Sequence, residues 1–315
     1  AFQDGWAATV LRILEVLVDA PAPGSERDPR KVAVLPGCHL TVADIEELRE
    51  TLEDFGLDPV FVPDLSGSLD GHVPEDFSPT TIGGTRREAI AALGTAGLVL
   101  AVGEQMRTAA EWLGKHIDAP VQLFDRLLGL AATDRLMAFL ADYSGRPVPA
   151  KYRRQRSQLV DAMLDGHFYT GGCKVAIGAE PDLLHGVGQF LAELGCELAA
   201  AVTTTDSPVL EHLPVEEVLI GDLEDLEAGA AGCDLLITHA HGRQMAERLD
   251  IPFLRMGLPI FDRLGAAHRL ALGYRGSRDF IFEVANALIA HGHDPHPDDW
   301  SVSDAPEAGA AAAVA

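Results

Sequence analysis

Residues 62–72, VPDLSGSLDGH, bring together side chains that hydrolases and cation sites use. Serine, histidine and aspartate can form a nucleophilic triad, and neighbouring carboxylate and hydroxyl oxygens can ligate a cation. The segment has no G-x-S-x-G elbow and no calcium-loop order of ligands, and a triad is normally gathered from separate elements. We therefore interpret its polar residues as turn-forming groups of a crevice or partner loop. The candidates are Asp64, Ser66, Ser68 and Asp70.

A second polar segment, TTIGGT at residues 80–85, places two glycines before a predicted helix. Backbone N–H groups at a helix amino end can bind an anion, so this segment is a second crevice or partner loop. Thr85 and Glu88 have the spacing of a capping box, which helix starts without a ligand also show. The candidates are Thr80, Thr81, Gly83 and Gly84.

His239 and His241 follow a predicted strand at residues 234–238, and a His-x-His pair at a strand end can bind a metal. No third ligand stands at a fixed spacing from them. Polar side chains at a strand-to-helix turn, with Gly242 easing the backbone, explain the same residues. We keep both histidines as crevice candidates, and we predict no catalytic residue and no metal ligand.

The four cysteines are far apart and form no Cys-x-x-Cys or Cys/His pair at zinc spacing. Each lies at or near the end of an apolar run typical of a buried strand. A free cysteine in that position usually behaves as a small hydrophobic residue. We therefore expect buried, unligated thiols at Cys38, Cys173, Cys196 and Cys233.

The charge balance excludes two classes of partner. Asp and Glu number 48 against 24 Lys and Arg, which gives a net charge of −24. A phosphate backbone or an anionic membrane would be repelled, so we predict neither nucleic acid nor membrane as a partner. No apolar span of 18 residues and no charged leader is visible, which predicts a cytoplasmic protein. One basic cluster stands out, which we interpret as a solvated helix face: Arg146, Lys151, Arg153, Arg154 and Arg156.

Short apolar runs alternate with segments of helical period, which is typical of parallel sheets flanked by helices. Residues 31–35 predict a buried strand, and Thr41 with Asp44 predicts a helix start. Ile45 and Leu48 fall on one face of that helix, and Gly56 suits its end. A second strand at residues 59–62 leads into the first polar loop.

The order of elements repeats along the chain. The segment from Lys31 resembles the one from Lys174, and the segment from Gly97 resembles the one from Cys233. The words Gln-Met and Phe-Asp-Arg-Leu occur in both copies of the second segment. The sequence thus predicts an α/β protein with two Rossmann-like parallel-sheet domains related by duplication.

The predicted domain plan has five parts. Residues 1–30 hold a helix, at 6–17, that would need another surface for its apolar face. The two Rossmann-like domains are residues 31–145 and 173–292, with a final helix at 280–290. Residues 146–172 form a linker with a bridging helix at 151–164. The composition of residues 293–315 predicts a disordered tail.

Several longer words in this sequence resemble the nitrogenase component 1 family, in particular its NifN-type subunits of the cofactor assembly scaffold. The resemblance runs from about Phe2 to His291. It implies pairing with a NifE-type subunit in an α2β2 heterotetramer that matures an iron–sulfur precursor with the nitrogenase iron protein and passes it to apo-nitrogenase. The words are PDLSGSLDGH (63–72), TTIGGT (80–85), PVPAKYRRQRSQLVDAMLDGHF (147–168), GDLEDLE (221–227), PFLRMGLPIFDRLG (252–265) and GYRGS (273–277).

The resemblance also implies a further amino-terminal domain with a cluster-ligating cysteine, and the first helix would then be its remnant, with an unpaired apolar face. None of the four cysteines lies in a family ligand motif, so we expect no cofactor bound by this chain alone. The iron–sulfur cluster and the precursor are expected in the full-length complex. Two alternatives remain. One is the beta subunit of nitrogenase or of a dark-operative (proto)chlorophyllide reductase, and the other is a small-molecule receptor of periplasmic type.

Overall fold

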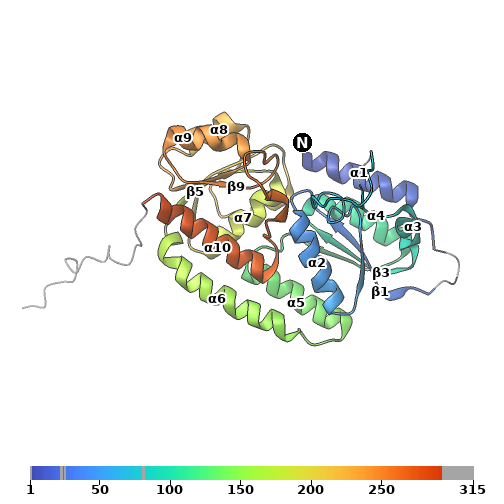
Figure 1. Ribbon diagram of the computed structural model, residues 1–315. Helices are drawn as coiled ribbons and strands as arrows, with labels where there is room; N and C mark the ends of the chain where they lie inside the picture. Colours follow the sequence, from blue (N-terminus) through green and yellow to red (C-terminus); the bar gives the residue numbers. More distant parts are fainter. Residues whose placement is uncertain (1, 22–23, 25, 80–81, 293–315) are drawn as a thin grey trace, which may run out of the picture.

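The computed structural model describes residues 2–21, 24, 26–79 and 82–292. Within these ranges the strands form two parallel sheets, and helices cover their faces (Figure 1). The predicted α/β class with two parallel sheets is confirmed. Thr80, Thr81 and the predicted tail at residues 293–315 lie outside the described residues.

The first sheet is built from β1 (Asp28–Pro36), β2 (Asp58–Phe61), β3 (Ala96–Val102) and β4 (Val121–Phe124). The strand order is β2-β1-β3-β4, and each neighbouring pair is parallel. The side chains from Val32 to Leu35 in the central strand are fully buried. A continuous apolar run is what a parallel strand covered on both faces requires.

Helices of the first unit are α2 (Val42–Asp54), α3 (Arg87–Ala91) and α4 (Arg107–Ile117), with short 3₁₀ turns η1 (Ala92–Thr95) and η2 (Glu104–Met106). Thr41 and Asp44 cap α2 reciprocally, as predicted, and Ile45 and Leu48 are fully buried. Gly56 follows the helix with a φ of 76°, which suits glycine at a helix end.

The second sheet is built from β5 (Lys174–Gly178), β6 (Glu197–Thr203), β7 (Leu219–Ile220), β8 (Leu235–Thr238) and β9 (Phe253–Arg255). Its order is β7-β6-β5-β8-β9, again parallel. Its helices and turns are α7 (Pro181–Glu193), η3 (Pro208–His212), α8 (Leu223–Gly229), η4 (Ala240–Gly242), α9 (Arg243–Leu249) and η5 (Ala266–His268).

Corresponding strands follow the same order in both sheets, with β7 as an added edge strand. Asp118 and Asp250 end the equivalent helices α4 and α9 in left-handed conformation, with φ of 53° and 54°, two residues before a proline. The shared words are not equivalent, however. Phe124 ends β4, whereas Phe261 lies six residues beyond the end of β9. The order of elements therefore supports the repeat, and the match of the words does not.

Four further helices complete the described chain: α1 (Phe2–Leu17), α5 (Leu130–Ser144), α6 (Ala150–Thr170) and α10 (Gly273–Ala290). Helices α6 and α10 lie side by side along one side of the molecule (Figure 1). Both are longer than predicted. We expected α1 to have an unpaired apolar face, which is wrong, because Val10 and Leu14 are buried in one cluster with Met106 and Leu113.

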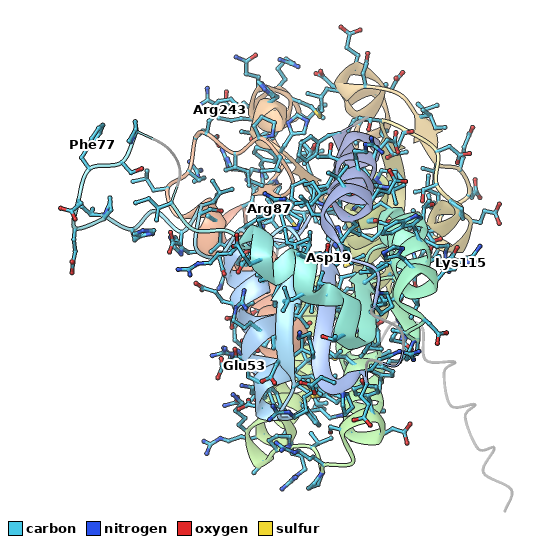
Figure 2. The ribbon with its side chains drawn as sticks, turned by 90° about the vertical axis from the view of Figure 1, so that its right-hand side faces the viewer. Asp19, Glu53, Phe77, Arg87, Lys115 and Arg243 are labelled. Carbon is cyan, nitrogen blue, oxygen red and sulfur yellow. The ribbon has the colours of Figure 1, made fainter. Side chains whose placement is uncertain are left out.

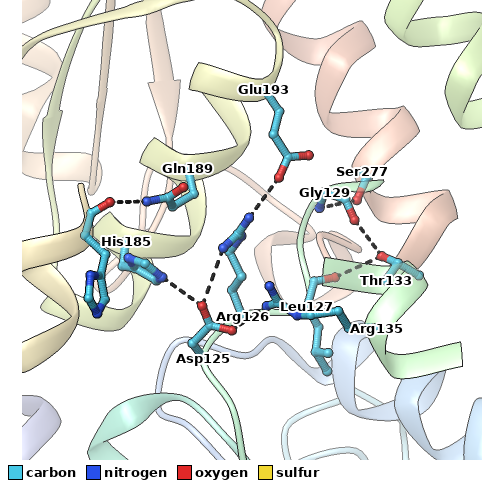
Figure 3. Close-up of polar contacts among 11 residues, drawn as sticks. Asp125, Arg126, Leu127, Gly129, Thr133, Arg135, His185, Gln189, Glu193 and Ser277 are labelled. Atoms are coloured by element: carbon cyan, nitrogen blue, oxygen red, sulfur yellow. Dashed lines mark hydrogen bonds and ion pairs between the residues drawn. The ribbon is translucent and has the colours of Figure 1, made fainter. Parts of the chain in front are cut away.

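Polar contacts join the two sheets where β4 ends (Figure 3). Asp125 Oδ2 lies 3.1 Å from Nε2 of His185 in α7, and Arg126 donates to Glu193 at 2.8 Å. Gly129 N donates to Ser277 Oγ of α10 at 2.8 Å. One apolar core cluster also contains residues of both sheets. The two sheets therefore share a core and polar contacts, which fix the loops at their carboxyl ends relative to each other.

Candidate functional site

A cavity of about 690 Å³ lies where the carboxyl ends of the two sheets meet. Residues that follow β1, β2 and β4 line one side, and residues that follow β5, β6 and β8 line the other. Parallel sheets place ligand sites at this edge, because the strand-end loops converge there. The side chains that line the cavity are mostly apolar, including Trp6, Leu40 and Leu183. This cavity is the candidate site.

The first polar loop contributes apolar side chains to the cavity. Leu65 and Leu69 line it, whereas the four polar candidates of this loop are not among the described lining residues. Asp64 instead pairs with Arg49 of α2 at 2.5 Å and accepts from the backbone N and Oγ of Ser66 at 3.0 and 2.6 Å. The polar groups of the loop are thus used within the turn, as Asx turns use them.

The remaining polar residues of this loop are close to solvent. Ser68 Oγ donates to the carbonyl oxygen of Asp64 at 3.3 Å. His72 Nδ1 lies 2.6 Å from Asp70 Oδ1, and His72 is exposed. Further along the loop Phe77 extends away from the body of the molecule (Figure 2). No hydrogen bond joins a described serine to His72 in this loop, so the described geometry contains no triad.

The second polar loop packs against the first. Gly83 and Gly84 have φ of 93° and 82°, and a Cβ on Gly83 would lie 1.6 Å from the carbonyl oxygen of Gly67. Glycine is therefore required for close approach of the two backbones. The predicted capping box is wrong, because Thr85 donates to the carbonyl oxygen of Phe61 and α3 begins after Arg86. Thr80 and Thr81 lie outside the described residues.

His239 lines the cavity, and His241 does not belong to the described lining. The backbone N of His241 donates to Nδ1 of His239 at 3.4 Å, and the His241 ring contacts Phe261 with centroids 5.0 Å apart. Burial and the neighbouring His241 lower the pKa of His239. Within the described residues no three His, Cys, Asp or Glu side chains are grouped to hold a metal ion. The described structure therefore shows a polar turn at the histidine pair.

All four cysteines are buried, as predicted, and none of them forms a disulfide: Cys38, Cys173, Cys196 and Cys233. Burial raises the pKa of Cys38 to about 12, and it also raises the pKa of Cys233. A thiol with a raised pKa is protonated at neutral pH and is a poor nucleophile or metal ligand.

Asp182, in the first turn of α7, is a lining residue that the sequence analysis missed. Its Oδ2 accepts from the backbone N and the side-chain Nε2 of Gln105 at 3.1 and 2.9 Å. Its backbone N donates to Gln3 of α1 at 3.1 Å. Asp182 thus joins α1, the first sheet and the second sheet at one corner of the cavity. Its place just after β5 was the available signal, but an acidic residue there is also typical of an ordinary helix start.

Buried polar atoms without a hydrogen-bond partner gather around this cavity. Among the described residues they include Asp182 Oδ1, His39 Nδ1, Thr203 Oγ1 and Arg126 Nε. Burial raises the pKa of Asp182 and lowers the pKa of His39, and the attraction between the two groups opposes both shifts only in part. Buried polar groups are normally paired, so these atoms indicate groups that a ligand or water would satisfy.

Comparison with known proteins identifies the family of this chain. A family model described as nitrogenase component 1 type oxidoreductase matches residues 1–289. The nitrogenase iron-molybdenum cofactor biosynthesis protein NifN of Bradyrhizobium diazoefficiens is 58% identical over 305 residues, which cover 95% of this chain and 65% of that protein. The protein of the same name from Rhizobium meliloti is 48% identical over 297 residues, covering 94% and 67%. The chain thus spans about two thirds of the length of these relatives.

Solved structures show the same similarity. A chain of "Nitrogenase Cp1 at pH 6.5" superposes with a TM-score of 0.83 at 30% identity, covering 91% of this chain and 65% of that chain. A chain of "Nitrogenase Cp1 at pH 5" has a TM-score of 0.62 at 12% identity, which shows a shared fold. In the part of the chain that the structure describes, no helix has both the length and the apolar character needed to cross a membrane.

Proposed function

Since this chain belongs to the nitrogenase component 1 type oxidoreductase family, we propose that it is a scaffold subunit for biosynthesis of the nitrogenase iron–molybdenum cofactor. The 58% identity to NifN over 95% of the chain is the observation that carries this proposal. The subunit pairs with a NifE-type partner in an α2β2 complex in the cytoplasm. That complex holds and matures an iron–sulfur precursor, works with the iron protein and delivers the product to apo-nitrogenase.

The cluster precursor is the cargo of this complex. The described residues do not fit a ligand set for it, because no three suitable side chains are grouped and the thiols of Cys38 and Cys233 have raised pKa values. We therefore assign no cluster ligand and no chemical step to this chain. Its described part contributes a two-sheet body with a shared core that positions a partner subunit.

The main alternative, a beta subunit of nitrogenase or of a dark-operative (proto)chlorophyllide reductase, shares this fold. Sequence identity favours the scaffold, because it is 58% with a NifN protein and 30% with the superposed nitrogenase Cp1 chain.

Co-purification with a NifE-type subunit tests the proposed pairing. We expect an affinity-tagged chain, co-expressed with that subunit, to elute with it in equal amounts at the mass of a heterotetramer. A longer chain extended to the full length of the relatives is tested in parallel, since this chain covers 65% of the first of them. A NifE-type subunit that elutes apart from both forms would contradict the proposal.

A further inference from the structure

We propose that the cavity between the two sheets is a binding site for a small organic cation, an amine on an apolar body, with Asp182 as the group that recognises the amine. This inference goes beyond the scaffold function and does not depend on it. It rests on the unpaired polar atoms, on the charges and on the apolar lining of the cavity.

The buried carboxylate of Asp182 is incompletely paired. Its side chain lines the cavity, and only 1% of the residue is exposed to solvent. Gln105 donates twice to Oδ2, but Oδ1 has no hydrogen-bond partner among the described residues. A buried carboxylate normally gains a cationic partner or a full set of donors, because desolvation without them is costly. Burial raises the pKa of Asp182, and a cationic donor at Oδ1 would both complete this site and favour the ionised carboxylate.

The neighbouring groups do not already supply that cation. His39 adjoins Asp182, since both side chains lie within 3.3 Å of a Cβ built on Gly103. Burial lowers the pKa of His39, which favours the neutral imidazole at pH 7. Its Nδ1 is unpartnered too, so this corner offers a second position for a hydrogen bond.

The lining offers an anionic ligand no free countercharge. The arginines that line the cavity are neutralised by carboxylates outside it, because Arg126 pairs with Glu193 and Arg269 pairs with Glu283. The carboxylates of Asp44 and Glu180 line the same cavity together with Asp182. Burial raises the pKa of Asp44 and of Asp182, so these two carboxyls are not counted as fixed negative charges. An anionic ligand would still find both lining arginines already paired.

The remaining lining of the cavity is apolar and would favour an apolar group on the ligand. Leucine, valine and methionine side chains form much of the wall, and the rings of Phe2 and Trp6, with centroids 6.4 Å apart, stand at one side. Thr203, 1% exposed, adds an unpartnered hydroxyl near the end of β6. A volume of about 690 Å³ lies within the range of small-molecule sites.

Tryptamine and indole-3-propionic acid test the proposal, because they share an indole body and differ in charge. We expect tryptamine to bind the chain with a stoichiometry of one in calorimetric titration at pH 7. At 100 times its Kd it should raise the Tm by about 5 °C. Indole-3-propionic acid should bind at least tenfold more weakly. Equal affinity for the two probes, or no saturable binding of tryptamine, would overturn the proposal.

Two variants locate the site. Asp182→Asn should weaken tryptamine binding at least tenfold, whereas Asp142→Asn, an exposed position on α5, should leave it unchanged. Because Asp182→Asn removes a buried charge and can impair folding, Leu69→Trp provides a second test. Leu69 lines the cavity but is 57% exposed, so a larger ring is tolerated there and narrows the cavity. Tryptamine affinity that survives both Asp182→Asn and Leu69→Trp would place the amine elsewhere and contradict the assignment.

Discussion

At the scale of residues, burial opposes ionisation of both Asp125 and Asp182, but the pKa values of the two carboxyls shift in opposite directions. Burial disfavours ionisation of Asp125, but the hydrogen bond with His185 and the charges of Arg135 and Arg126 outweigh it and lower the pKa of Asp125 to about 2. Asp182 has no comparable cationic partner, and burial raises its pKa. The first carboxylate therefore stabilises the contact between the sheets, whereas the second is left open toward the cavity.

The lowered pKa of Asp125 gives a pH-dependent stability. The folded-state pKa lies below the unfolded value of about 4, so the contribution is fully present above pH 4 and is lost as pH falls to about 2. We expect Asp125→Asn to lower the free energy of unfolding by about 1–3 kcal/mol at pH 7. Urea unfolding measures this free energy, and the difference in free energy of unfolding between the variant and wild type should shrink between pH 4 and 2. A difference that is constant over that range would show that Asp125 does not titrate as described.

At Gly83 the backbone of Gly67 leaves no room for a Cβ, and this lack of space requires glycine in addition to the positive φ. A Cβ there would overlap the carbonyl oxygen of Gly67, whereas Gly71 has a similar φ of 75° and nothing within 4 Å. We expect Gly71→Ala to cost about 1 kcal/mol through its left-handed backbone, and Gly83→Ala to cost clearly more. Thermal unfolding of the two variants provides the comparison. Equal losses would mean that the two loops do not pack together.

At the scale of elements, sequence patterns predicted the strands well and predicted their equivalence less well. The predicted strands at residues 31–35 and 234–238 correspond to β1 and β8, because a parallel strand covered on both faces admits few sequences other than a continuous apolar run. The shared Phe-Asp-Arg-Leu motif suggested equivalent positions in the two units, which is wrong, because a motif of four residues does not determine the structural alignment. In the first unit Phe124 belongs to the core, whereas Phe261 is 65% exposed. Long-range contacts such as that of Asp182 with Gln105 are set by tertiary packing, and no local pattern predicts them.

The packing of helix α1 against the first unit can be tested by its contribution to the free energy of unfolding. Leu14 is fully buried against the first sheet's helices, whereas Val16, two residues on, is 62% exposed. We expect Leu14→Ala to lower the free energy of unfolding by about 2–5 kcal/mol, because it leaves a cavity in the core. Val16→Ala should change it by less than about 0.5 kcal/mol. Chemical denaturation checks both values, and similar effects of the two substitutions would contradict the described packing of α1.

At the scale of the whole molecule, the two sheets form one body with a shared core and a cavity at their common edge. The alternation of strands and helices predicted the architecture, and the family words predicted the scaffold role. A crevice was predicted at the strand-end loops, but composition and periodicity gave no indication of its mostly apolar wall, because that wall is assembled from several loops and from α1. The polar loop at residues 62–72 was predicted to line the crevice with its polar groups. The structure instead places Leu65 and Leu69 there.

The most direct test of the scaffold role is complementation of a nitrogen-fixing bacterium that lacks its own NifN gene. The gene is supplied as this chain extended to the length of its relatives, and acetylene reduction and cofactor content of the nitrogenase are measured. If the chain is a scaffold subunit, both are restored to within about tenfold of the parent strain, whereas an empty vector restores neither. Stable expression of the extended chain together with a nitrogenase that remains without cofactor would contradict the scaffold role.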